Sequence, residues 1–366
     1  MIRVAIDGTP LLGARTGIGE VVSGLATALG ARTDLEVTAY ALTWRGRHDL
    51  EGEVPPGVRA ATSPIPARFV RAAWMHTDHP RIERWTGPLD VVHATNYVAP
   101  PTHGAAVVSV YDLTFVRFPE LCTPDALQYP TLLRRALARG ASVHTTSDFV
   151  AAEVAAEFSL APDRIIRVYP GVPTTSGGDA ARGRATAGFD RYVLSLGTIE
   201  PRKNLPGLVH AFDAVAGSDP DVGLVVAGAP GWGADQYTET VARARHGDRI
   251  RTLGYVSSAI RSDLLAGAAV LAYPSRYEGF GFPPLEAMAA GVPVVATRAG
   301  AIPEVVGDAA LLVDVDDADE LAGALLDVLS DDERRRTLVT LGHARVQDFS
   351  WSAAAAELAE FYERLA

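Results

Sequence analysis

Two basic residues stand side by side in the segment GTIEPRKNL (197–205), directly after the apolar run Tyr192–Leu196. They are Arg202 and Lys203, and Lys203 is the only lysine among the 366 residues. Arginine offers a planar fork of N–H donors and lysine a compact charge, and both suit a diphosphate. A solvated charged turn is the alternative interpretation. The pattern predicts an anion site where a strand of a parallel sheet ends.

Two glutamates stand eight positions apart in YEGFGFPPLEAMAAGVPVV (277–295). Glu278 is followed by Gly279 and Gly281, which let the backbone approach a ligand closely. Glu286 falls in the first turn of a helix that the preceding Pro-Pro pair begins, where a carboxylate is favourable even without a ligand. Carboxylates only accept hydrogen bonds, so they suit the hydroxyl groups of a sugar or a ribose, which must donate.

A glycine-rich segment near the N-terminus, from Gly13 through Gly17 to Gly19, has the spacing of a short-chain dehydrogenase loop. That family also pairs a tyrosine with a lysine four residues later. Here Lys203 is the only lysine and position 199 is Ile, so the pair is absent and hydride transfer is excluded. Gly17 and Gly19 open a helix, where bare backbone N–H groups suit a ligand phosphate or hydroxyl. A plain strand-to-helix turn is the alternative.

These segments lie in a regular alternation of short β-branched runs and helical patterns, which predicts parallel sheets covered on both faces. In the first half we expect strands at 2–7, 37–43, 91–95, 106–111, 142–145 and 165–169, with helices at 20–29, 125–139 and 148–158. In the second half we expect strands at 192–196, 223–227, 249–253, 270–273 and 293–296, and helices at 205–216, 234–245, 257–266 and 284–290.

The segment 173–188 has almost no large apolar residue and predicts a linker. We therefore expect two doubly wound, Rossmann-like α/β domains that face a central cleft, which is where a ligand should bind. The first domain spans 1–172 and the second spans 189–350. A final helix, 351–366, is expected to pack back on the first domain.

The composition excludes several classes of protein. The hydrophobic fraction of 48% is too high for disorder, and the net charge of −11 argues against a nucleic-acid binder. Residues 1–172 carry 16 basic and 17 acidic residues, against 17 and 27 in the remainder, which supports two different domains. One cysteine excludes an internal disulfide and suits a cytoplasmic protein. We find neither a signal peptide nor an apolar run long enough to span a membrane.

Several motifs together resemble the retaining glycosyltransferases of family 4, which have the GT-B fold. They are GTIEPRKNL, LGYV (253–256), YEGFGFPPLEAMAAGVPVV and PEVVGDAALLV (303–313), with TGIG (16–19), DVVHATNYVAP (90–100) and FSW (349–351) in support. The match covers nearly the whole chain. It is closest to the branch that includes bacterial mannosyltransferases of cell-surface polysaccharide biosynthesis.

The resemblance implies roles for the matching positions. Arg202 and Lys203 hold the donor diphosphate, and Glu278 contacts hydroxyls of the transferred sugar, so these three are the expected catalytic group. Glu286 holds the ribose, and the backbone around Tyr255 flanks the base. The whole expected donor-binding set is Gly17, Gly19, Tyr111, Thr198, Tyr255, Gly279, Phe280, Gly281, Phe282 and Glu286.

One pair departs from the family pattern. Many relatives have His-Asp after the strand that ends near Val110, and the histidine reaches the donor sugar; here the pair is Tyr111-Asp112. Tyrosine still hydrogen-bonds a hydroxyl, but it is larger and not a cation. We place His93 and Asp112 on the acceptor or sugar side. A satisfied histidine at a strand end is an equal alternative for His93.

Two features could mislead. Asp314 and Asp316 have the Asp-x-Asp spacing of metal-dependent glycosyltransferases, but helix capping explains them, and His76 and His79 lack further ligands. No metal and no cofactor is expected. A basic aromatic stretch suggests peripheral contact of the first domain with a membrane, with an ordinary surface helix as the alternative. Its members are Arg68, Phe69, Arg71, Trp74, Arg81, Arg84 and Trp85.

The resemblance thus implies a retaining, metal-independent transfer of a hexose from a nucleotide sugar to an acceptor hydroxyl. The acceptor is a glycan, a lipid-linked molecule or a small molecule. Mannose is favoured, from GDP-mannose ahead of a UDP-sugar. A GT-B sugar-nucleotide epimerase and a non-catalytic nucleotide-sugar-binding protein are the alternatives.

Overall fold

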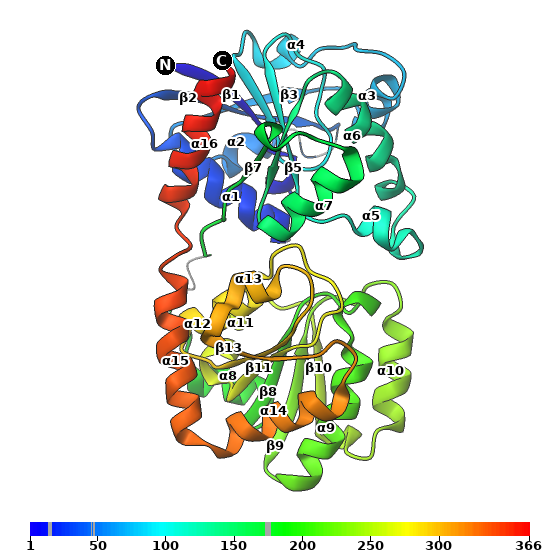
Figure 1. Ribbon diagram of the computed structural model, residues 1–366, viewed down its shortest axis with the longest axis vertical. Coiled ribbons are helices and arrows are strands. Elements are labelled where there is room, and N and C mark those ends of the chain that lie inside the picture. The colour runs from blue at the N-terminus through cyan, green and yellow to red at the C-terminus, as the bar shows by residue number, and fades with distance from the viewer. Residues whose placement is uncertain (14–16, 45, 47, 173–176) are drawn as a thin grey trace. The chain divides into compact units, whose positions relative to one another are not determined.

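A computed structural model describes residues 1–13, 17–44, 46, 48–172 and 177–366. The chain forms two compact units (Figure 1). Unit 1 comprises Met1–Gly171 and Phe349–Ala366, and unit 2 comprises Val172–Asp348. Each unit has its own parallel β-sheet, so the α/β class expected from the alternating pattern is confirmed.

Unit 1 contains a seven-stranded parallel sheet of order β3-β2-β1-β4-β5-β6-β7. Its strands are β1 (Ile2–Asp7), β2 (Leu35–Leu42), β3 (Val58–Ser63), β4 (Val91–Ala94), β5 (Ala105–Val110), β6 (Ser142–Thr145) and β7 (Ile165–Arg167). Its helices are α1 (Gly17–Gly30), α2 (Leu50–Glu53), α3 (Ala67–Trp74), α4 (Glu83–Thr86), α5 (Thr114–Arg117), α6 (Tyr129–Ala138), α7 (Asp148–Phe158) and α16 (Trp351–Leu365). The strands expected from the sequence do not include β3, which pairs with β2 at the edge of this sheet.

Unit 2 contains a six-stranded parallel sheet of order β10-β9-β8-β11-β12-β13. Its strands are β8 (Arg191–Leu196), β9 (Val222–Ala227), β10 (Ile250–Gly254), β11 (Val270–Tyr273), β12 (Val294–Thr297) and β13 (Ala310–Val313). Its helices are α8 (Ala180–Ala187), α9 (Leu205–Ser218), α10 (Ala234–Arg243), α11 (Ser258–Gly267), α12 (Phe282–Ala289), α13 (Ile302–Val306), α14 (Ala318–Ser330) and α15 (Asp332–Val346). Every residue of β9, β11 and β12 is buried, because helices cover both faces of the sheet.

Helix α16 belongs to unit 1 although it follows unit 2 in the sequence, and it lies beside α1 (Figure 1). Ser350 caps its first turn by accepting from the N–H of Ala353. The Trp351 indole lies against Gly24 and Gly171, where an added Cβ would come within 2.4 and 2.5 Å of that ring. The two glycines therefore create the slot that the indole fills.

The predicted linker, 173–188, is wrong in its second half. Residues from Ala180 to Ala187 form α8, which packs against α11 in unit 2. The Asp179 side chain caps α8, and the Arg182 guanidinium pairs with Asp263 of α11 at 2.9 Å. Gly183 packs its Cα against the Asp263 carbonyl, which is why small residues are required there. The small residues of 180–187 therefore serve a close contact between two helices and do not form a linker. Residues 173–176 of the predicted linker lie outside the described residues.

Candidate active site

The carboxyl ends of β8 and β11 form the point at which the strand order of unit 2 reverses. The two strands are neighbours, yet β9 and β10 extend the sheet on one side and β12 and β13 on the other. Loops at such a switch point diverge to opposite faces and leave a crevice that doubly wound sheets use for ligands. The loop after β8 carries Arg202 and Lys203, and the loop after β11 carries Glu278.

Local backbone geometry fixes the first of these loops. Gly197 has φ +138°, a conformation that an L side chain rarely adopts, and its Cα faces the Lys203 side chain. Pro201–Lys203 forms one 3-10 turn, and Asn204 follows at φ 50°. Gly228 closes the loop from behind, because a Cβ there would lie 1.8 Å from the Gly197 carbonyl oxygen. The two cations are therefore presented by a tight, defined turn.

The structure brings together the three residues that we predicted to be catalytic. Lys203 Nζ donates to Glu278 Oε1 at 2.5 Å, and Arg202 Nη1 donates to Glu278 Oε2 at 2.8 Å. Arg202 also donates to Glu200 at 2.8 Å, and Lys203 donates to the Tyr273 hydroxyl at 2.9 Å. The exposed fractions of the Arg202, Lys203 and Glu278 side chains are 18%, 13% and 7%, so solvent screens their charges little.

Burial and the neighbouring charges shift the pKa values of the groups in this cluster. Burial alone would raise the pKa of Glu278, but the charges of Arg202 and Lys203 outweigh burial and hold that pKa at about 2. Burial lowers the pKa of the Lys203 ammonium, against the opposing effect of Glu278. Burial and the nearby Glu278 charge raise the pKa of Tyr273 well above its ordinary value. Glu278 is thus ionised at neutral pH and acts only as a hydrogen-bond acceptor.

Gly300, which is not among the residues predicted from the sequence, supports Glu278 from the next loop. Gly300 has φ +56°, and a Cβ there would lie 2.2 Å from the Glu278 carbonyl oxygen. The N–H of Ala301 donates to that same carbonyl at 2.9 Å. The Gly300-Ala301 pair follows β12 and contains no charged or aromatic group, so only its position in the fold identifies it.

Glu286 lies one turn into α12 and is 4% exposed. Gly281 precedes this helix at φ +113°, and a Cβ there would meet Ile302 at 2.6 Å. The Arg261 guanidinium of α11 forms an ion pair with Glu286, and this partner is not among the residues predicted from the sequence. A lone arginine 25 residues before its partner gives no local pattern. Glu286 is a paired, oriented carboxylate rather than a simple helix-terminus charge.

The remaining donor-side positions of unit 2 lie at the same edge of the sheet. Thr198 is exposed in the loop after β8, and Tyr255 is 64% exposed directly after β10. Gly279 and Phe280 are buried, and the Phe280 ring contacts the Phe282 ring with centroids 5.1 Å apart. The structure therefore gathers all the unit 2 candidates at the carboxyl ends of the strands.

The predicted glycines of unit 1 open α1. Gly17 is exposed and has open space where a Cβ would lie, whereas Gly19 is buried. Residues 14–16, which include the threonine of TGIG, lie outside the described residues. The Asp112 carboxylate accepts from the N–H of Thr114 at 2.9 Å, at the start of α5. The Tyr111 hydroxyl donates to the Thr95 carbonyl at 2.8 Å, so it is already engaged.

His93 is in the arrangement that the alternative interpretation describes. Its side chain is completely buried, with Nδ1 2.5 Å from the Tyr362 hydroxyl of α16 and Nε2 2.9 Å from Ser109 Oγ. Ser109 Oγ in turn lies 2.9 Å from His144 Nδ1. Burial, with the nearby His144, lowers the pKa of His93 well below its ordinary value. Both ring nitrogens are occupied inside unit 1, so a ligand role is not supported.

The residues that could suggest a metal have other partners. Asp314 pairs with Arg298 at 2.9 Å and Asp316 with Arg276 at 2.7 Å. The cap of α14 that we assigned to them is made by Asp317 instead, which accepts from the N–H of Glu320. His76 and His79 are both exposed. Within the described ranges, no three His, Cys, Asp or Glu residues are grouped as a metal site would require.

Most of the basic aromatic stretch packs within unit 1. Trp74 is 2% exposed, and its indole N–H donates to the Pro80 carbonyl at 2.9 Å. Arg71 pairs with Asp125 at 2.9 Å, while Phe69 is 57% exposed with Arg68 over its ring. No helix in the described part of the chain has the length and hydropathy needed to cross a membrane. These contacts are those of an ordinary surface helix, which was our alternative interpretation.

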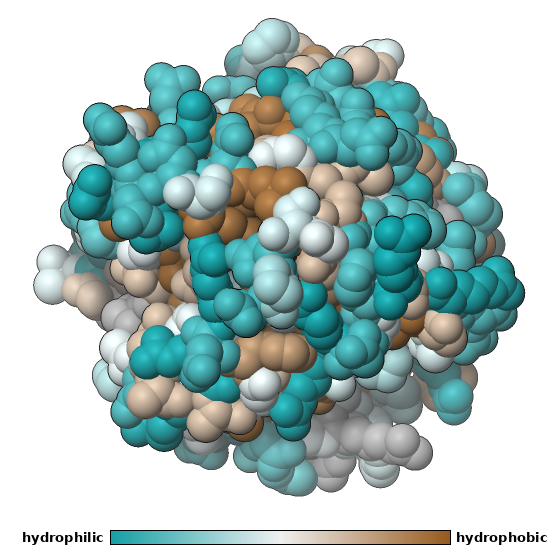
Figure 2. Space-filling model, turned by 90° about the horizontal axis from the view of Figure 1, so that it is seen from below, coloured by the Kyte–Doolittle hydropathy of each residue, from teal (hydrophilic) through white to brown (hydrophobic). Residues whose placement is uncertain are grey.

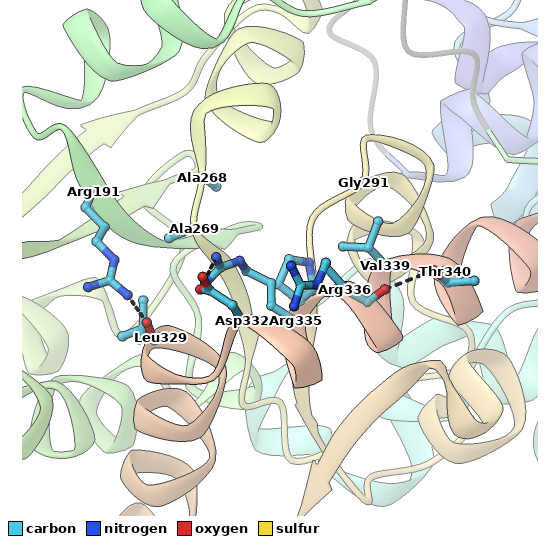
Figure 3. A pocket seen from close by; sticks show the side chains of 11 residues that line it. Arg191, Ala268, Ala269, Gly291, Leu329, Asp332, Arg335, Arg336, Val339 and Thr340 are labelled. Carbon is cyan, nitrogen blue, oxygen red and sulfur yellow. Dashed lines mark hydrogen bonds and ion pairs between the residues drawn. The ribbon is translucent and has the colours of Figure 1, made fainter.

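A hollow of about 700 Å³ lies at the opposite, amino-terminal end of the unit 2 sheet (Figure 3). Two of the three arginines that line it are already paired: Arg191 pairs with Asp219 and donates to the Leu329 carbonyl, and Arg335 pairs with Asp332. The face drawn in Figure 2 is largely hydrophilic, with a small apolar group near its centre. The hollow contains none of the predicted site residues, so the switch point remains the candidate site.

Comparison with known proteins agrees with this geometry. The model of "Glycosyltransferase Family 4" matches residues 15–176, and that of "Glycosyl transferases group 1" matches residues 182–343. The chain is 33% identical over 300 residues to O-antigen chain mannosyltransferase B of Escherichia coli, covering 78% of each chain.

Two solved structures share the fold over the whole chain. Sucrose-phosphate synthase from Thermosynechococcus elongatus superposes with a TM-score of 0.77 at 21% identity, covering 100% of this chain and 99% of the other. Anabaena HepE in complex with UDP and glucose gives 0.73 at 19% identity, covering 100% of both chains. The likeness to glycosyltransferase family 4 and the α/β, GT-B fold class inferred from the sequence are confirmed. The chain belongs to glycosyltransferase family 4, has the GT-B fold of two parallel-sheet α/β domains, and is a glycosyltransferase related to bacterial mannosyltransferases.

Proposed function

We propose that this enzyme transfers mannose, with retention of the anomeric configuration and without a metal ion, from GDP-mannose to a hydroxyl of a glycan, a lipid-linked molecule or a small-molecule acceptor. One observation carries the donor assignment. A buried carboxylate, Glu278, contacts two cations, Arg202 and Lys203, at the switch point of unit 2. A nucleotide sugar has the matching chemistry, because its hydroxyl-bearing ring is bonded directly to a diphosphate.

The roles follow from this match. As the bond from the sugar to the diphosphate breaks, negative charge grows on the leaving nucleoside diphosphate. Arg202 and Lys203 are already oriented by Glu278 and by the tight turn, so they stabilise that charge with little reorganisation. Glu278 accepts from hydroxyls of the sugar, and Glu286, held by Arg261, accepts from the ribose.

Mannose and GDP are supported by the similarity to O-antigen chain mannosyltransferase B. The HepE structure contains UDP and glucose, so a UDP-sugar is the competing donor. The test incubates the full chain separately with GDP-mannose and UDP-glucose, with a short mannoside as acceptor, and follows nucleotide release and product formation. We expect transfer from GDP-mannose, with an α-linkage in the product by NMR. Transfer from UDP-glucose alone would overturn the donor assignment, and a β-linked product would overturn retention.

Chelation provides a separate prediction. Because Arg202 and Lys203 supply the positive charge at the diphosphate, we expect transfer to persist in excess EDTA. The measurement is the initial rate of transfer before and after chelation. The same rate is then measured after Mg²⁺ or Mn²⁺ is added. Loss of the rate on chelation and its recovery on adding metal would contradict metal independence.

A further inference from the structure

The loop after β11 holds the turn Pro201–Lys203 through Arg276 as well as through Glu278. The N–H of Arg276 donates to the Arg202 carbonyl at 2.8 Å, and Arg276 Nη1 donates to the Pro201 carbonyl at 3.2 Å. In the opposite direction, Arg202 Nη1 donates to the Tyr277 carbonyl at 2.8 Å. Reciprocal hydrogen bonds therefore join the loop to the turn, and the Arg276 side chain makes one of them.

The loop after β13 orients the Arg276 side chain. Arg276 Nε donates to Asp316 Oδ1 at 2.7 Å, so one guanidinium joins this loop to the turn. Asp316 has a φ of 65°, a left-handed conformation that few residues other than glycine adopt. Helix capping does not account for this conformation, because Asp317 makes the cap of α14. A non-glycine residue persists in this conformation only where the surrounding contacts fix it.

The turn Pro201–Lys203 needs such a hold if it faces a diphosphate. Arg202 and Lys203 are adjacent residues of this one 3-10 turn, and Glu278 binds both of them. A diphosphate that binds the same two cations competes with Glu278 and pulls the turn toward itself. The Arg276 guanidinium opposes that displacement, because it is tied to the loop after β13.

We propose that Arg276 and Asp316 are a positioning pair that holds the turn Pro201–Lys203 against the loop of Glu278 during transfer. Asp316 fixes the Arg276 guanidinium, and the guanidinium fixes the first carbonyl of the turn. Both residues act through the turn and not by contact with the sugar or the diphosphate. Misplacing a group in an active site by about 1 Å can cost about 100-fold in rate, so a small shift of the turn matters. The inference rests on the proposed function, in which this turn faces the diphosphate.

A neighbouring ion pair provides a matched control. Asp314 lies two positions before Asp316 and pairs with Arg298 at 2.9 Å. The Arg298 and Arg276 side chains are 49% and 44% exposed, and exposed ion pairs contribute little to stability. Arg298 also pairs with Glu320 of α14, so it joins the loop after β13 to that helix. The two arginines therefore differ mainly in the contact that Arg276 makes with the turn.

Steady-state kinetics of the full chain, with GDP-mannose and the mannoside acceptor, test the pair. Arg276→Ala and Asp316→Gly should each lower kcat about tenfold, while KM for GDP-mannose and the dissociation constant of GDP change less than about twofold. Glycine keeps the positive φ of position 316 and removes only the side chain. Asp316→Asn keeps that φ and an acceptor for Arg276, so it should retain most of the wild-type kcat. Arg298→Ala should leave kcat within about twofold.

The double variant Arg276→Ala/Asp316→Gly separates positioning from two independent structural effects. Because Asp316 acts through Arg276, the double variant should lose no more kcat than Arg276→Ala alone. Losses that multiply, an equal loss in Arg298→Ala, or a wild-type kcat in Arg276→Ala would each overturn the pair. If Lys203→Ala is impaired and Arg276→Ala is not, only this inference fails, whereas wild-type turnover by Lys203→Ala counts against the proposed function itself. If the full chain transfers from UDP-glucose alone, the same ratios are measured with that donor.

Discussion

Replacing Lys203 by alanine should lower kcat/KM by roughly 30- to 1,000-fold, which corresponds to about 2–4 kcal/mol of transition-state stabilisation. The Lys203 ammonium is placed by the Gly197 turn, Tyr273 and Glu278, and the sequence contains no other lysine. In the proposed mechanism its charge matters most as the leaving diphosphate gains negative charge. The measurement is steady-state kinetics with GDP-mannose and a mannoside acceptor.

The same variant should also lose stability, which the sequence pattern did not predict. On sequence grounds a loop lysine is removable without harm, but Lys203 forms an ion pair with the nearly buried Glu278. Removing one partner of a buried pair costs up to about 3–5 kcal/mol, and the loss here should be smaller because Arg202 still faces Glu278. Kinetics should therefore be measured well below the Tm of the variant. Arg298→Ala is the matched control, since Arg298 lies at the same edge of the sheet but half exposed.

Glu278→Gln separates the proposed sugar contact from the proposed diphosphate contact. The amide keeps the shape of the side chain but is no longer an acceptor on both heteroatoms. Arg202 still has Glu200 as a partner and Lys203 still has Tyr273, so sugar transfer should fall sharply and GDP affinity should fall much less. If Glu278→Gln lost transfer and GDP affinity equally, Glu278 would lie at the nucleotide. For the other variant, Lys203→Ala, turnover at the wild-type rate would refute the role of the lysine at the phosphate.

Much of the fold was predictable because buried parallel strands have a strong local pattern. Apolar runs such as YVLSL and GLVVA of unit 2 are flanked by helical patterns, and most strands of both sheets show the same local pattern. The edge strand β3 (VRAATS) was missed because two of its residues are exposed and its apolar character is weak. The segment now assigned to α8 was mistaken for linker, since its small residues serve a contact with α11 that is distant in sequence.

The candidate site was predictable in residue identity but not in arrangement. Motif spacing led to Arg202, Lys203 and Glu278, yet nothing local indicates that the carboxylate binds both cations. Arg261 and Gly300 act through partners 25 and 22 positions away, so only the fold reveals them. His93 shows the converse. A histidine at a strand end suggests a ligand contact, and its actual partner, Tyr362, lies 269 positions later.

Deleting Trp351–Ala366 should abolish transfer while unit 2 stays folded and keeps part of its affinity for GDP. Helix α16 contributes large buried side chains to unit 1, among them Leu358, Phe361 and Tyr362. Burying such a side chain stabilises a protein by about 1.5–3 kcal/mol, so losing several removes an amount comparable to the ~5–15 kcal/mol of a whole domain. The deletion also empties the Gly24–Gly171 slot and leaves His93 without its Tyr362 partner.

Differential scanning calorimetry with and without GDP measures this outcome. We expect the truncated chain to lose the transition of unit 1 and to retain one transition that GDP shifts to higher temperature. A milder variant, Trp351→Ala, should lower the stability of unit 1 by about 3–5 kcal/mol, because the two glycines cannot fill the slot. Glu363→Ala is the control within the same helix, since Glu363 is exposed. Near-normal transfer by the truncated chain would show that α16 is not needed for transfer and would refute the prediction. Loss of GDP binding together with transfer would show that unit 2 depends on α16 for its own folding.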